Sequence, residues 1–284
     1  MTTSEPKAGN SSAAGPDDIS DRKSSAQHVQ AWLKNHGAAL EMEVASKMLV
    51  GPSTVEHSGY FRDAKTGALR EFDVHATFRK HTYVPPISFE IHVIAECKAS
   101  APPWVLYMAS DTFGARDWDF ETFFETSSHA AKTVRNLSSF SFAPLFRTAR
   151  PHAYQVAEAA TKNSTPYAAV QQVLDAVEGI RASHVASDES AAQASDSRDT
   201  RPALRIYVPI LITTSPLFEV RLSATGETEV TETHVAPLFT KRDRDGAVID
   251  RLVWVAHQSA IDEVVRMTMS SLDTMNLGSE SAAD

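Results

Sequence analysis

The stretch that decides the fold is ISFEIHVIAECKA, which occupies residues 87–99 of the 284-residue chain. Successive side chains of a β-strand point to opposite faces of the sheet, so the stretch divides into two sets. The apolar set is Ile87, Phe89, Ile91, Val93, Ala95 and Cys97. The other set ends with an acid and a base, Glu96 and Lys98, two positions apart. Because Pro102 and Pro103 follow, we predict a central strand that stops just after this charged pair.

A second strand, REFDVHATF at residues 70–78, shows the same division. Its apolar face is Phe72, Val74, Ala76 and Phe78, and its polar face is Glu71, Asp73, His75 and Thr77. The separation of 23 positions between Asp73 and Glu96 is compatible with an antiparallel hairpin that sets the two carboxylates side by side. His75 and His92 share these polar faces, and we expect hydrogen-bonded surface histidines, with contact to a substrate as the alternative.

Two adjacent carboxylates raise each other's pKa unless a cation lies between them. Mg²⁺ and Mn²⁺ are hard cations that take oxygen ligands, and they lower the pKa of bound water and offset phosphate charge. A lysine beside such an ion can stabilise a developing anion, so Asp73, Glu96 and Lys98 together suit hydrolysis of a phosphodiester. The simpler alternative is a solvated Asp73 and a surface pair of Glu96 and Lys98, worth ~0–1 kcal/mol.

The composition limits the classes of protein to which the chain can belong. Hydrophobic residues make up 42% and charged residues 22%, which is ordinary for a soluble globular protein. The net charge of −9 repels a polyanion, so binding of nucleic acid requires a local basic patch. The single cysteine, Cys97, excludes an internal disulfide and a cysteine-based zinc site, and we expect a buried thiol in a reducing cytoplasm. The N-terminus lacks the apolar run of a secretory signal, and no apolar run is long enough to span a membrane.

The chain is expected to form a single domain over residues 26–278. Tails at 1–25 and 279–284 and an insertion at about 182–202 are too polar to pack, and we predict disorder there. A helix over residues 26–51, divided near His36 and Gly37, precedes the two strands. A second helix, over 165–180, and a final amphipathic helix are separated by further strands, an order that predicts a mixed α/β architecture.

Asp73, followed by Glu96-Cys97-Lys98 at the end of a strand, resembles the PD-(D/E)xK motif of restriction-endonuclease-like nucleases. The first residue of the motif departs from the pattern, because Phe72 replaces proline. The resemblance covers residues 38–215 and implies an α/β fold with a restriction-endonuclease-like mixed sheet flanked by helices. It implies that Asp73 and Glu96 bind Mg²⁺ (or Mn²⁺) and that Lys98 is the catalytic lysine.

The resemblance also suggests further site residues on the helices. Many members carry a metal-binding glutamate on the first helix, and Glu43 is favoured over Glu41. Some members carry a glutamine on a later helix, where Gln172 is the candidate and Gln171 its rival. Trp104 follows the motif and could stack on a base, although core packing is the favoured interpretation.

The function that follows from the resemblance is Mg²⁺-dependent cleavage of nucleic acid. DNA is favoured over RNA, in restriction, repair or phage defence. The acidic chain would reach DNA with help from a protein partner or as a homodimer. The alternatives are a catalytically inactive binding or assembly module of the same fold, and a hydrolase that acts on another phosphorylated or carbonyl substrate.

Overall fold

A computed structural model describes residues 25–33, 37–81, 88–109, 125–127, 145, 151–159, 165–194, 203–244 and 247–274. Within this part of the chain, eleven strands form one mixed sheet in the order β1-β2-β3-β7-β11-β10-β6-β4-β8-β9, and β5 pairs with β7. The strands are β1 (Ser53–Arg62), β2 (Leu69–His81), β3 (Ser88–Lys98), β4 (Trp104–Met108), β5 (Glu125–Ser127), β6 (Ala153–Glu158), β7 (Ala203–Thr213), β8 (Leu217–Leu222), β9 (Thr228–Thr233), β10 (Val235–Arg244) and β11 (Ala247–His257). The helices are α2 (Ala38–Met48), α5 (Thr165–Ala194), the 3-10 turn η2 (Gln258–Ala260) and α6 (Ile261–Thr274). The predicted mixed α/β architecture is confirmed.

Strand β3 lies in the interior of the sheet, third in the strand order. It pairs antiparallel with β2 on one side and parallel with β7 on the other. All its residues from Ser88 to Cys97 are buried, which confirms the prediction of a central strand. The predicted core position of Cys97 is confirmed as well, since its side chain is 6% exposed.

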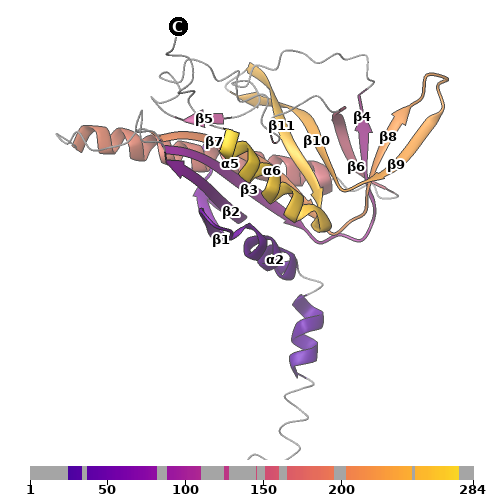
Figure 1. Ribbon diagram of the computed structural model, residues 1–284, viewed down its shortest axis with the longest axis horizontal. Coiled ribbons are helices and arrows are strands. Elements are labelled where there is room, and N and C mark those ends of the chain that lie inside the picture. The colour runs from indigo at the N-terminus through magenta and orange to yellow at the C-terminus, as the bar shows by residue number, and fades with distance from the viewer. Residues whose placement is uncertain are drawn as a thin grey trace, which may run out of the picture.

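Helices cover both faces of the sheet around β3 (Figure 1). On one face, α2 and α6 pack against the apolar set of β3 through Leu40, Val44, Met48, Ile261, Val264 and Leu272. On the other face, α5 packs through Ala169, Val173, Val177 and Ile180 against residues of β3, β7 and β11. The spacing of these α5 residues is that of one helical face, which explains why the helix lies flat on the sheet.

The first helix divides where the sequence indicated. Residues 25–33 are helical, and α2 begins after Gly37, whose φ of 76° lies in the left-handed region that glycine adopts readily. The tails predicted at 1–25 and 279–284 lie, apart from Ser25, outside the described residues.

The disordered insertion predicted at 182–202 is wrong over its first part, because α5 continues to Ala194. The stretch is rich in alanine and lacks large apolar residues, so it forms helix while offering few core contacts. Polar contacts join it to β7 instead: His184 Nδ1 lies 2.8 Å from the hydroxyl of Tyr207, and Arg205 donates to Asp188 at 2.6 Å. Residues 195–202 lie outside the described part of the chain.

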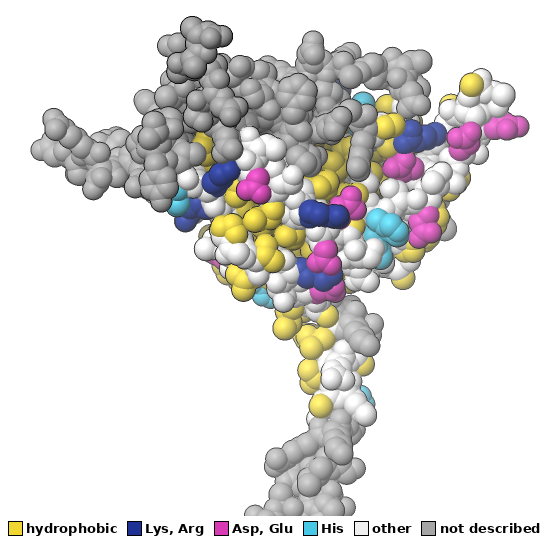
Figure 2. Space-filling view, in the orientation of Figure 1, with side chains coloured by type: hydrophobic (Ala, Val, Ile, Leu, Met, Phe, Trp, Pro, Cys, Tyr) yellow, Lys and Arg dark blue, Asp and Glu magenta, His cyan; other side chains and the backbone are white. Residues whose placement is uncertain are grey.

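The surface seen from the side of α6 carries mixed charges (Figure 2). Basic and acidic side chains of the described residues alternate over this view, without a continuous basic track among them. None of the described helices combines the length and hydrophobicity that a membrane crossing requires.

Candidate active site

The site forms where β2 and β3 separate. Their antiparallel ladder runs from His81 opposite Ser88 to Val74 opposite Ala95 and ends there, which confirms the predicted hairpin pairing. Just beyond this end, the backbone N–H of Cys97 donates to Asp73 Oδ2 at 2.6 Å. The carboxylate of Asp73 therefore occupies the end of the ladder and lies over the last residues of β3.

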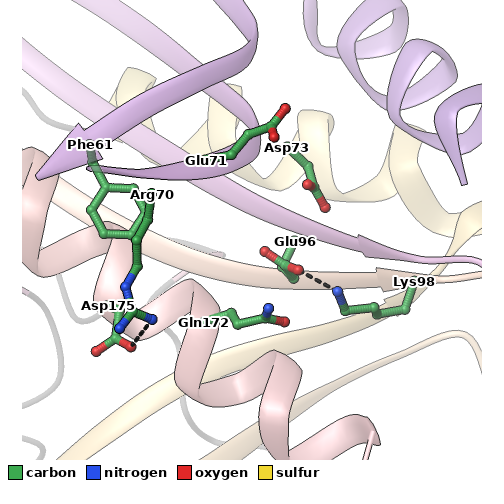
Figure 3. A pocket seen from close by; sticks show the side chains of 8 residues that line it. All are labelled: Phe61, Arg70, Glu71, Asp73, Glu96, Lys98, Gln172 and Asp175. Carbon is green, nitrogen blue, oxygen red and sulfur yellow. Dashed lines mark hydrogen bonds and ion pairs between the residues drawn. The ribbon is translucent and has the colours of Figure 1, made fainter. Parts of the chain in front are cut away.

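A pocket of about 430 Å³ opens at this point, between the β1–β2 hairpin, the end of β3 and α5 (Figure 3). Its lining residues are Phe61, Arg70, Glu71, Asp73, Glu96, Lys98, Gln172 and Asp175. Lys98 Nζ donates to Glu96 Oε1 at 2.5 Å. Asp73, Glu96 and Lys98, together with Gln172 rather than its rival Gln171, are thus brought into one cavity from three elements that are distant in the sequence.

The close approach of α5 to the hairpin depends on Gly179. A Cβ at this position would lie 2.4 Å from a ring atom of Phe61 and 2.7 Å from the backbone oxygen of Arg62. Glycine therefore permits the contact that closes the α5 side of the pocket. Nothing in the period of the helix distinguishes this position, so the sequence alone did not reveal it.

The surroundings of Asp73 and Glu96 disfavour the charged form of both carboxylates. Burial raises the pKa of Asp73 to about 7, and the negative charge of Glu96 adds to this effect, while the N–H of Cys97 opposes it. Burial also raises the pKa of Glu96, against the opposing effect of the Lys98 ammonium. A cation bound between these groups would relieve both the burial of charge and the repulsion.

Of the two glutamates considered on the first helix, Glu41 and the favoured Glu43, only Glu41 has an electrostatic effect on the pocket carboxylates. Glu41 flanks the buried stripe of α2, and its charge contributes to the raised pKa values of both Asp73 and Glu96. Glu43 lies on another side of the helix, is 44% exposed and pairs with Lys47 at 3.4 Å. Glu41 also has a partner, since its Oε2 lies 3.4 Å from Nε2 of His57, and neither glutamate is among the residues that line the pocket.

Asp73 and Glu96 are carboxylates, the type of donor that hard divalent cations take. Among the described residues, no group of three or more His, Cys, Asp or Glu side chains is arranged to hold a metal ion. Mg²⁺ in particular is bound in proteins by one or two carboxylates and keeps several waters. Asp73 and Glu96 supply two carboxylates, each with one oxygen engaged by Cys97 or Lys98 and a second oxygen to offer.

Two residues suggested as site-shaping lie elsewhere. His75 is not a surface residue as expected: it is 9% exposed, and its Nε2 lies 2.9 Å from Nδ1 of His92, away from the pocket lining. Trp104 is fully buried at the start of β4, so core packing, the favoured interpretation, is confirmed and stacking on a base is wrong.

Four lining residues were not identified as site residues from the sequence: Phe61, Arg70, Glu71 and Asp175. A signal existed for Asp175, which follows Gln172 by three positions and therefore shares its helix face. Comparison of the chain with protein-family models, with curated proteins and with solved structures found no match. The resemblance to PD-(D/E)xK nucleases rests on the motif residues themselves.

Proposed function

We propose that this protein is a Mg²⁺-dependent nuclease of the PD-(D/E)xK type that hydrolyses phosphodiester bonds in DNA. One observation carries the proposal: Asp73, Glu96 and Lys98 line a single open pocket at the end of two paired strands. Buried carboxylates with raised pKa values beside a lysine are typical of functional sites, where charge is held ready for a ligand.

The residues of the pocket have distinct roles in this proposal. Asp73 and Glu96 would hold Mg²⁺, which when bound lowers the pKa of its water and offsets the charge of the phosphate. Lys98, whose Nζ lies 2.5 Å from Glu96, is positioned to donate to a phosphate oxygen and stabilise the charge that develops during attack. Glu41 adds a third negative charge near the pair, and the amide of Gln172 offers a donor from α5.

The test is cleavage of linear and circular DNA, and of RNA, by the purified chain with Mg²⁺, with Mn²⁺ and with EDTA. We expect cleavage in either metal and none in EDTA. Lys98→Met keeps the length of the side chain and removes its charge, so we expect the rate to fall about 10²–10³-fold. Lys47→Met is the matched control, because Lys47 pairs with Glu43 and Asp262 outside the pocket.

The outcomes separate the alternatives. Equal rates for Lys98→Met and Lys47→Met would contradict the assignment of the site. Cleavage of RNA alone would keep the metal site and change the substrate. A wild-type chain that binds Mn²⁺ in calorimetry and cuts neither polymer would contradict the nuclease and favour an inactive binding module.

A further inference from the structure

Arg70 is the second basic residue of the pocket, and no role follows for it from the motif. The lining carries four acids and two bases, and one of these bases, Lys98, is engaged by Glu96 at 2.5 Å. Arg70 lies on β2 on the other side of the group of lining side chains from Lys98 (Figure 3). Its side chain is 46% exposed, so solvent and ligands can reach it.

The guanidinium of Arg70 is held from behind by a rigid partner. Its Nε lies 2.7 Å from Oδ2 of Asp63, which is 4% exposed. Oδ1 of Asp63 accepts from the backbone N–H groups of Lys65 and Thr66, both at 2.9 Å. Hydrogen bonds from the turn therefore fix the carboxylate that orients Arg70, and they lower the pKa of Asp63, which keeps it charged.

Most hydrogen-bonding capacity of Arg70 remains for a ligand. A guanidinium has five N–H donors, and the contact with Asp63 uses the one on Nε. Nη1 of Arg70 also forms a long ion pair with Oδ2 of Asp175 at 3.8 Å, which is beyond hydrogen-bond distance (Figure 3). The two terminal nitrogens form the fork that suits the bidentate binding of a phosphate.

Asp175 is itself engaged by another arginine. Arg242 of β10, whose side chain is 3% exposed, donates to Asp175 at 2.5 Å and to Glu178 at 2.8 Å. This buried cation offsets the charge of Asp175, so Asp175 does not compete strongly for the terminal nitrogens of Arg70. Arg70 thus presents an oriented, partly exposed guanidinium to a cavity whose other end carries the proposed metal ligands.

We propose that Arg70 binds a backbone phosphate next to the one that is cut, and so positions the strand in the pocket. The inference rests on the proposed nuclease function. Contacts to flanking phosphates fix the register of a nucleic acid without reading its sequence. Arg70 is therefore a positioning residue rather than a catalytic one.

The test compares Arg70→Gln with Arg62→Gln, which removes the same charge. Arg62 is the matched control because its Nη1 donates to the backbone oxygen of Gly67 on the exposed hairpin and it does not line the pocket. We expect Arg70→Gln to raise KM about tenfold with kcat little changed, and to reduce the slope of log affinity against log salt by about one. Arg62→Gln should change neither, and Arg70→Lys, which keeps the charge without the fork, should give an intermediate KM.

A second measurement detects the contact itself. In DNA oligonucleotides with one neutral methylphosphonate linkage, moved stepwise along the strand, we expect one position beside the cut to raise KM for the wild type about tenfold. A methylphosphonate at that position should not change the KM of Arg70→Gln, because this variant already lacks the contact with that phosphate.

Equal responses of the wild type and Arg70→Gln at every position, with cleavage intact, would overturn the inference and leave Arg70 as a structural partner of Asp63. A wild type that cuts neither DNA nor RNA in Mg²⁺ or Mn²⁺ would overturn the proposed function and this inference with it. The two failures are therefore distinguishable.

Discussion

Two polar clusters lie on the face of the sheet that α5 covers, and they treat charge in opposite ways. The first is the pocket around Asp73 and Glu96. The second, here called the histidine cluster, lies toward the other end of β2 and β3. Its members are His75, Thr77, Glu90, His92, His184, Arg205 and Tyr207.

The histidine cluster is buried and closed by hydrogen bonds. His75 Nε2 lies 2.9 Å from His92 Nδ1, and His92 Nε2 lies 3.2 Å from Glu90. Burial lowers the pKa of His75 to about 3 and that of His184 to about 4, so both are neutral at pH 7. Glu90 keeps its charge, because its bonds to His92 and the charges around it lower its pKa despite burial.

The contrast shows how burial can serve either stability or binding. In the histidine cluster each charge meets a partner or is removed by a lowered pKa, and the network ties β2, β3, β7 and α5 together. In the pocket, carboxylates with raised pKa values are left facing an open cavity. A protein of marginal stability retains such an unfavourable arrangement where a ligand uses it, which is why we place function in the pocket.

The largest expected effect comes from Asp73→Asn, which should lower cleavage at least about 10²-fold yet stabilise the metal-free fold. The pKa of Asp73 is about 7 in the folded state, compared with an ordinary value of 3.8 that applies to the unfolded chain. Stability therefore falls as pH rises between these values, and the penalty is complete above pH 7. Asparagine carries no such penalty, so we expect a gain of about 1–4 kcal/mol in urea unfolding at pH 8 without metal.

Addition of Mg²⁺ to the wild type and to Asp73→Asn provides a second comparison. It should raise the melting temperature of the wild type and leave that of Asp73→Asn unchanged, since binding to the folded state stabilises it. Asp262→Asn, at an exposed residue of α6 outside the pocket, is the matched control. The opposite result would be an Asp73→Asn variant that is less stable than the wild type at pH 8 and is still stabilised by Mg²⁺. The proposed difference between the two clusters would then be wrong.

The histidine cluster should respond in the opposite manner. His92→Phe keeps a ring of similar volume and removes the contacts of His92 with Glu90 and His75. Glu90 keeps its bonds to Arg79 and Arg205, and among the described residues His75 keeps only the longer contact with Thr77 at 3.4 Å. A poorly satisfied buried polar group costs about 1–3 kcal/mol, and His75 is the one such group left in the described part of the cluster, so we expect a loss of roughly 1–3 kcal/mol in urea unfolding. Cleavage by the folded fraction should change less than about threefold, because the cluster lies outside the pocket lining.

His28→Phe, at an exposed residue of the first helix, controls for the change of side chain. A fall in cleavage as large as that of Asp73→Asn, without a loss of stability, would show that the histidine cluster takes part in the reaction. The division between a structural and a functional cluster would then be wrong.

The alternation of residues 70–78 and 87–99 was sufficient to predict two paired strands and the meeting of Asp73, Glu96 and Lys98. A period of two predicts which side chains share a face, and pairing then brings the faces of two strands together. Phe72 is the exception, because it packs in the core on the α5 side, whereas Val74, Ala76 and Phe78 pack in the core of the other face. The histidine cluster could not be predicted, because it joins strands to a helix far along the chain by contacts that leave no local pattern. The full length of α5 was missed for a related reason. The composition of a polar, alanine-rich segment is compatible with either a helix or disorder, and the contacts that decide between them, such as that with Arg205, come from a distant part of the chain.

The smallest expected effect distinguishes Glu41 from Glu43, the choice that depends on how α2 is rotated. The charge of Glu41 reaches Asp73 and Glu96, whereas Glu43 pairs with Lys47 in solvent. We expect Glu41→Gln to weaken Mn²⁺ binding about tenfold in calorimetry, as loss of a nearby carboxylate typically does, and Glu43→Gln to change it less than about twofold. The reverse order would mean that Glu43, which pairs with Lys47 in this structure, moves to the cation when it binds, and the assignment of Glu41 would then be wrong.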